Sequence, residues 1–193
     1  MTTKTLQVIE VSFVVILSLA SVAAGIPVET TTRDGAPVPI APTHSVRDPG
    51  ERVRTASVVL AGLIQIATER STTFRRLVGI VNASDGIVYV DAGTCGHGVR
   101  ACLVSVVQAG PSRLVYIRVD MRVQQRALAA AIGHELQHAV EVLSEAGVTS
   151  NAEMYFFYRR TGRRSIGDTF ETLAALDAGY AVLSELDGAF PTQ

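Results

Sequence analysis

The sequence predicts an α+β fold in which two N-terminal helices, a small mixed or antiparallel sheet and three C-terminal helices follow one another. Two observations predict it. Apolar residues recur at helical intervals before residue 82 and after residue 124, whereas the segment between them holds β-branched runs separated by turn residues. The chain has 193 residues, enough for one domain with a single core, which we expect to span residues 51–193.

The first 50 residues are expected to lie outside this domain. Val11 to Ala24 forms an apolar stretch that follows one positive residue, Lys4, and ends in small residues. A membrane-spanning helix needs about 20 apolar residues, so the stretch predicts a signal peptide over residues 1–24, with an uncleaved N-terminal anchor as the alternative. Residues 25–50, rich in Pro and Thr, predict a flexible spacer. Either way, the domain is expected to be extracytoplasmic, secreted or periplasmic.

The N-terminal half of the domain is predicted from the periodicity of each segment. Helical spacing of apolar residues predicts one helix between Val53 and Arg70 and a second, capped by Ser71 or Thr72, that ends near Asn82. Three β-branched runs predict strands, and a Gly-Pro-Ser sequence predicts a hairpin turn between the last two. The strands are expected at residues 87–90, 99–107 and 114–119, with the turn at 110–112.

Three helices are expected in the C-terminal half. Gln124 to Glu145 contains no Pro and meets Gly147 as a stop signal, which predicts the longest helix of the domain. An aromatic segment from Ser150 to Arg160 predicts a short helix, and Thr169 to Leu186 predicts the last one.

Charge and cysteine content limit the partners and the compartment. The formal net charge is −1, and no basic block, aromatic–basic alternation or acidic tail suggests nucleic acid or a charged partner. Cys95 and Cys102 are the two cysteines, and an exported protein is expected to pair them in a disulfide. The segment Cys95-Gly96-His97 also suggests a metal site, but no second Cys/His pair at zinc-site spacing follows it.

The long helix carries the motif with chemical meaning, His134-Glu135-Leu136-Gln137-His138. Two histidines four residues apart lie one turn above each other on one face of a helix, so both imidazoles can reach one ion. Zn²⁺ accepts nitrogen and oxygen ligands in tetrahedral geometry, and it acidifies bound water. Glu135 flanks the ion and is expected to take the proton of that water as the general base. The alternative is a buried helix whose histidines are satisfied by ordinary hydrogen bonds.

This motif and its uncharged flanks resemble the active-site helix of zincin metallopeptidases. Together with Phe170 to Ala175, the segment from Gly133 to Val142 looks like a group of small exported bacterial proteins with a minimal gluzincin arrangement. The resemblance implies a zinc-dependent peptidase in which the edge strand of a small sheet aligns an extended peptide. The metzincin subclass is excluded, because Glu141 and Ser144 stand where its pattern requires Gly and His. A resemblance to peptide deformylases is excluded as well, because their motif would require Asp where Gln137 stands.

A gluzincin needs a third ligand, a glutamate from a later helix, and two candidates exist. Ser150 to Glu153 has the spacing of a capping box, which gives Glu153 a structural role. Glu171 lies 33 residues beyond His138 and is expected to open the last helix. Asp168 to Glu171 also matches a cap, but the resemblance implies that Glu171 is the ligand.

Four other residues are candidates for supporting roles. Glu141 lies one turn beyond His138, where it either orients the imidazole or belongs to a solvated helix face. Tyr155, Tyr158 and Tyr180 are candidate donors to an oxyanion, but the interpretation that we favour for each is a core aromatic residue whose hydroxyl reaches the surface.

The sequence therefore predicts a zinc-dependent hydrolase, with His134, His138 and Glu171 as metal ligands and a peptide or protein as substrate. The peptide bond as target comes from the resemblance. The rival interpretation is a non-catalytic domain that keeps zinc for structure, and a fourth ligand from Cys95 or His97 would support it.

Overall fold

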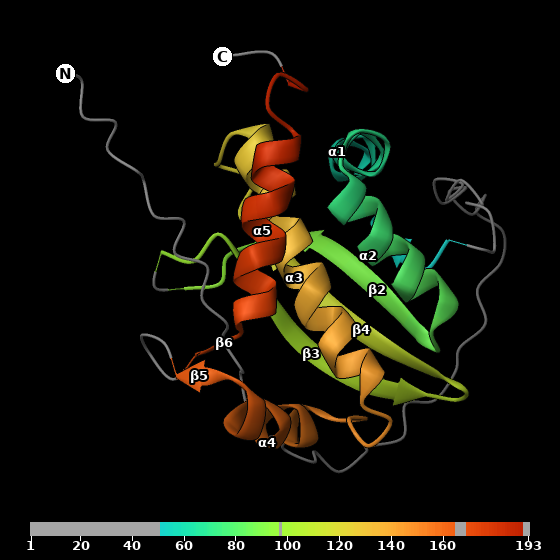
Figure 1. Cartoon of the computed structure of the whole chain (residues 1–193). Helices are drawn as coiled ribbons and strands as arrows, with labels where there is room; N and C mark the ends of the chain where they lie inside the picture. Colours follow the sequence, from blue (N-terminus) through green and yellow to red (C-terminus); the bar gives the residue numbers. More distant parts are fainter. Residues whose placement is uncertain (1–50, 97, 165–168, 191–193) are drawn as a thin grey trace, which may run out of the picture.

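The computed structural model describes residues 51–96, 98–164 and 169–190 (Figure 1). The predicted signal peptide and spacer lie outside these residues and stay predictions. Of the helices in the described ranges, none has both the length and the apolar composition that crossing a membrane requires. The elements follow the predicted order of helices, sheet and helices, which confirms the α+β fold class.

The centre of the fold is a mixed sheet of four strands in the order β1-β2-β4-β3. Strand β2 (Gly86–Ala92) pairs in parallel with β1 (Val53–Arg54) and with β4 (Ser112–Val119). Strand β3 (Ala101–Ala109) pairs antiparallel with β4 through the predicted hairpin and forms one edge of the sheet. Along β4, buried residues alternate with partly exposed ones, so one face of the sheet packs against the core.

Helices α1 (Val58–Arg70) and α2 (Thr72–Ala83) lie between β1 and β2 in the chain, and Ser71 caps α2 as predicted. The expectation that the first helix extends back toward Val53 was wrong. Val53 pairs with Val88 as a strand and is buried in the core, so tertiary pairing overrides the helical spacing of its side chain.

The long helix α3 (Gln125–Ser144) lies against the sheet, and α5 (Leu173–Glu185) crosses its outer side (Figure 1). Two glycines allow the helices to approach closely. A Cβ atom on Gly133 would lie 2.8 Å from Cγ2 of Val182, and one on Gly179 would lie 3.3 Å from Cβ of His134. Close contact between α5 and α3 therefore covers one flank of the histidine motif.

The C-terminal end of α3 is fixed to the sheet by a buried arginine of β4. Arg113 donates hydrogen bonds to the carbonyl oxygens of four residues at or after the last turn of α3, at 2.6–3.2 Å: Val142, Leu143, Glu145 and Val148. It also forms a bidentate ion pair with Asp85, at 2.7 and 2.9 Å. These bonds satisfy carbonyl groups that a helix end leaves without partners.

A small hairpin separates α4 (Asn151–Thr161) from α5. Strand β5 (Arg163–Arg164) pairs antiparallel with β6 (Phe170–Glu171). The prediction that Glu171 opens the last helix was wrong, because α5 begins at Leu173 and its cap is Thr172, whose Oγ accepts the N–H of Ala175 at 3.1 Å. Asp168, the other candidate cap, lies outside the described residues.

The predicted disulfide between Cys95 and Cys102 is present, with the two Cα atoms 5.9 Å apart. It ties the connection that follows β2 to the start of β3, and both half-cystines are buried. Disulfides persist in oxidising compartments, which agrees with an extracytoplasmic location.

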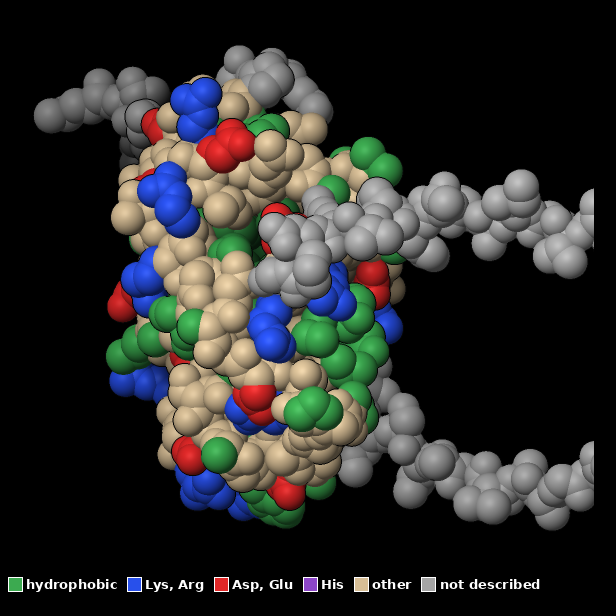
Figure 2. Space-filling view, turned by 90° about the vertical axis from the view of Figure 1, so that its right-hand side faces the viewer, with side chains coloured by type: hydrophobic (Ala, Val, Ile, Leu, Met, Phe, Trp, Pro, Cys, Tyr) green, Lys and Arg blue, Asp and Glu red, His purple; other side chains and the backbone are tan. Residues whose placement is uncertain are grey.

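On the side of the molecule where α1 and α2 lie, acidic and basic side chains are interspersed (Figure 2).

Candidate metal centre

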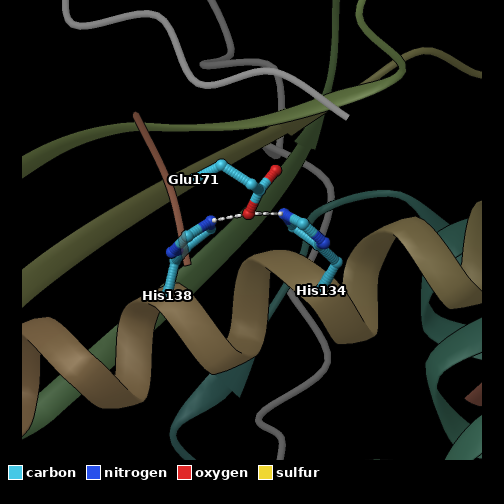
Figure 3. Close-up of side chains that lie close together, drawn as sticks. All are labelled: His134, His138 and Glu171. Carbon is cyan, nitrogen blue, oxygen red and sulfur yellow. Dashed lines mark ion pairs between the residues drawn. The ribbon is translucent and has the colours of Figure 1, made fainter. Parts of the chain in front are cut away.

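Helix α3 brings His134 and His138 to one face, as the four-residue spacing predicts (Figure 3). Their side chains are 3% and 1% exposed, and the ring centroids lie 4.9 Å apart. Both Nε2 atoms point at one carboxylate oxygen of Glu171. The Nε2–Oε1 distance is 3.2 Å from His134 and 3.3 Å from His138.

Glu171 reaches this position from β6 rather than from a helix. The short hairpin lays the residue beside α3, and its Oε1 also accepts the N–H of Thr172 at 3.0 Å. The donor atoms of His134, His138 and Glu171 all lie within 4.8 Å of one another, so the three residues could hold a metal ion. The structure therefore brings together the three predicted ligands, although two of them are separated by 33 residues.

Glu135 points into the interior beside this group, and its side chain is fully buried. Its Oε1 lies 4.0 Å from Nε2 of His134. Neither carboxylate oxygen makes a hydrogen bond within the described part of the chain, although the backbone N–H of Leu103 in β3 is near enough to lower the pKa. Burial has the larger effect and raises the pKa of Glu135. A buried carboxyl group without a hydrogen bond is costly to a fold, so a role beyond packing is indicated.

A second carboxylate, that of Glu141, binds the ring nitrogen of His138 that faces away from Glu171. Its Oε2 accepts the Nδ1–H of His138 at 3.0 Å, which leaves Nε2 of that ring facing Glu171. Thr172 donates its hydroxyl hydrogen to Oε1 of Glu141 at 2.7 Å, and the Tyr158 hydroxyl lies 3.4 Å from Oε2. Of the two interpretations of Glu141, the orienting role is the one that these contacts favour.

The contribution of Thr172 was missed by sequence reasoning. One hydroxyl group caps α5 and also braces Glu141, so the same residue fixes the helix start and the second carboxylate. A faint signal existed, because Thr is a preferred N-cap residue. The competing match from Asp168 to Glu171 concealed it, since Thr172 is followed by Ala rather than Glu at the third helical position.

The charges in the group are strongly coupled. Burial lowers the pKa of His138, but hydrogen bonds to Glu141 and Glu171 outweigh burial and raise it to about 10. Burial likewise opposes ionisation of Glu171, but its bonds to both histidines lower its pKa to about 2. In the metal-free protein at neutral pH, a proton on His138 therefore partly balances several carboxylates, and a divalent cation can take its place.

The remaining candidates in the described residues have contacts other than those of a metal ligand. Glu153 accepts the backbone N–H of Thr149 at 2.8 Å and its hydroxyl hydrogen at 2.7 Å at the start of α4, which agrees with a capping role. The Tyr158 hydroxyl donates to the carbonyl oxygen of His138 at 3.0 Å, whereas Tyr180 is 47% exposed. Cys95 is oxidised and cannot ligate a metal in this state. His97 lies outside the described residues.

No protein-family model, curated protein or solved structure matches this chain. The structural support for a zincin-like site is therefore the grouping of His134, His138 and Glu171 around the motif helix.

Proposed function

We propose that this protein is a zinc-dependent peptidase, with His134, His138 and Glu171 as the metal ligands and Glu135 as the general base. The observation that carries the proposal is the convergence of two imidazole nitrogens on one carboxylate oxygen, beside a buried and unbonded glutamate. A structural metal site does not require such a glutamate, whereas hydrolysis by an activated water does.

The distances between the ligand atoms suit zinc. A tetrahedral site with bonds of about 2.0–2.1 Å separates its ligand atoms by roughly 3.3 Å. The two Nε2–Oε1 distances, 3.2 and 3.3 Å, agree with this spacing. Two nitrogens and one oxygen would fill three of the four positions of a bound zinc ion, a ligand set that is typical of catalytic rather than structural zinc.

The residues of the chain have separate tasks in the proposed reaction. Zinc, when bound, supplies Lewis-acid polarisation and a lower water pKa. Glu135 accepts a proton from the attacking water and passes it to the amine that leaves. Burial, which raises the pKa of Glu135, makes its carboxylate a stronger base than an exposed glutamate. Glu141 keeps the His138 ring oriented throughout, because it accepts the Nδ1–H.

The edge strand β3 is the surface on which a peptide would lie. Two backbone N–H groups in its second half already have partners. Val106 donates its N–H to Oδ1 of Asn151 at 2.9 Å, and Gln108 donates its backbone N–H to the carbonyl oxygen of Thr149 at 3.0 Å. An extended peptide can therefore pair only with the first half of β3. That half contains Leu103, whose backbone N–H is near Glu135.

The test is cleavage of an unfolded protein by zinc-loaded protein that starts at residue 51. Peptide products should appear, disappear with a chelator and return when zinc is added. The Glu135→Gln variant should retain zinc but lose activity by a factor of about 10² or more, because an amide cannot accept the proton. Equal activity of this variant would remove Glu135 from the mechanism. A zinc-loaded parent that cleaves nothing would instead support the non-catalytic interpretation.

A further inference from the structure

A second feature lies at the far end of the same helix pair. An open hollow of about 450 Å³ is lined by Arg100, Arg122 and Arg126 together with Ala127 of α3 and Leu183 of α5. Three arginines in one hollow indicate an anionic ligand, because guanidinium groups bind carboxylates and phosphates in preference to neutral groups.

Not all of the three charges are available. Arg122 forms a bidentate ion pair with Asp120, with distances of 2.8 and 3.0 Å from its Nε, and Arg126 pairs with Asp187. Arg100 differs from both, because its guanidinium has no hydrogen-bond or ion-pair partner among the residues in the described ranges. Among the described residues that line the hollow, Arg100 is therefore the one whose positive charge no carboxylate balances.

The first turn of α3 adds to this potential. The cap residue Gln124 also lines the hollow, makes no side-chain capping bond, and is followed by no acidic residue in the first turn. The partial positive charge at a helix N-terminus therefore adds to that of Arg100 rather than being cancelled by an acidic residue in the first turn.

Spacing along three segments of the chain gives the distance from this hollow to the candidate metal site. Ala127 lies seven residues before His134 on α3, which is two turns on the same face and about 10 Å. Arg100 lies three residues before Leu103, whose backbone N–H is near Glu135, and three residues of extended strand also span about 10 Å. On the third element, Leu183 lies one turn of α5 beyond Gly179, which packs against His134.

The hollow is therefore bounded by the same two helices as the candidate metal site and by the connection that leads into β3, at a distance that three residues of an extended peptide would cover. We propose that it is a specificity subsite for an acidic side chain, with Arg100 as its principal contact, about three residues to one side of the bond that is cut. This inference rests on the proposed peptidase function and adds the substrate class, an acidic peptide.

Binding to an inactive variant tests the subsite without relying on turnover. Zinc-loaded Glu135→Gln protein is titrated by calorimetry with blocked heptapeptide amides of Ala and Ser, in which one position at a time carries Glu, each beside its Gln twin. At one position, the Glu peptide should bind about tenfold more tightly, since an ion pair replaces a neutral contact. Arg100→Gln should reduce that ratio to about one, whereas Arg70→Gln, an exposed arginine of α1, should leave it unchanged.

Salt and zinc separate this subsite from simpler explanations. The ratio should fall between 0.05 and 0.5 M salt, because screening weakens an exposed ion pair. Equal affinity for the twins at every position, absence of binding, or a preference that survives Arg100→Gln would overturn the proposal. A preference for Glu that persists in Arg100→Gln but is lost when zinc is removed would place the carboxylate on the metal instead. A parent enzyme that cuts nothing while the Arg100-dependent preference persists would overturn the peptidase function alone.

Discussion

Glu135 and Glu141 lie on the same helix, six residues apart, and show how surroundings divide the work of two identical side chains. Glu135 is fully buried without a hydrogen bond in the described part of the chain, and burial raises its pKa. Burial acts on Glu141 in the same direction, but hydrogen bonds from His138, Thr172 and Gln137 lower its pKa. One carboxylate is therefore suited to accept a proton and the other to stay ionised beside an imidazole.

The contact between Glu141 and His138 leads to a prediction about metal affinity. Glu141→Gln should weaken zinc binding by about 10–100-fold, because a neutral amide oxygen holds the imidazole less firmly and makes it a poorer ligand. Competition with a chelator measures the effect. Glu145→Gln is the matched control, since Glu145 lies one turn further along and is exposed. Equal affinity in both variants would show that Glu141 does not support the ligand.

Proton release gives a second prediction at this scale. The pKa of about 10 means that His138 is protonated at pH 7 without metal, so zinc must displace at least one proton. Calorimetric titration with zinc at pH 7, in two buffers of different ionisation enthalpy, should count one proton or more. Zinc affinity should rise by about tenfold per pH unit between pH 6 and 8. Binding without proton release would contradict the coupling of His138 to the two carboxylates.

The same shifts set the pH dependence of the metal-free fold. The raised pKa of His138 stabilises the fold fully below about 6.5, and this contribution disappears as pH rises through about 10. The lowered pKa of Glu171 stabilises it above about 4.5, and that contribution is lost as pH falls through about 2. Both contributions are fully present only between about pH 4.5 and 6.5.

At the scale of elements, the position of α3 depends on its anchored C-terminal end. Arg113 is 3% exposed and satisfies several carbonyl groups there. Arg113→Met should lower the free energy of unfolding by about 2–4 kcal/mol, because those carbonyls would be buried without donors. Urea unfolding measures the loss, with Arg160→Met on the exposed side of α4 as the control. A cost equal to that of the control would show that the anchor is dispensable.

The disulfide carries a prediction of its own. Replacing both Cys95 and Cys102 by Ser should lower stability by about 2–3 kcal/mol in the chain-entropy picture, given a sequence separation of seven residues. Thermal unfolding should show a melting temperature lower by roughly 5–10 °C. Two thiols that react freely with an alkylating reagent in protein recovered from outside the cell would contradict the pairing.

Long periodic elements were predictable from the sequence, and short ones were not. Helix α3 and the strands of the hairpin follow their predicted spans to within two residues, because each buries a face with its own repeat. Strands β1 and β6 have two residues each, too few to show any repeat. Both owe their conformation to pairing with a partner elsewhere in the chain, and no local propensity reports such pairing.

At the scale of the whole molecule, the candidate site depends on contacts between distant segments. The motif predicted that His134 and His138 share a helix face, because four-residue spacing suffices for that. It did not predict that Glu171 would come from a strand, or that Thr172 would link α5 to Glu141. The hollow around Arg100 could not be predicted from the sequence either, since its lining comes from the connection before β3, from α3 and from α5.

The central claim is that these distant segments meet in a metal site, and the third ligand tests it most directly. Zinc dissociation constants of the parent, Glu171→Gln and Glu153→Gln should be measured by competition with a chelator. We expect Glu171→Gln to weaken binding by about 10² or more, because a neutral oxygen is a poor ligand for a divalent cation. Glu153→Gln, which changes only a helix cap, should bind as the parent does. Normal binding by Glu171→Gln, or loss of binding in Glu153→Gln, would contradict the account.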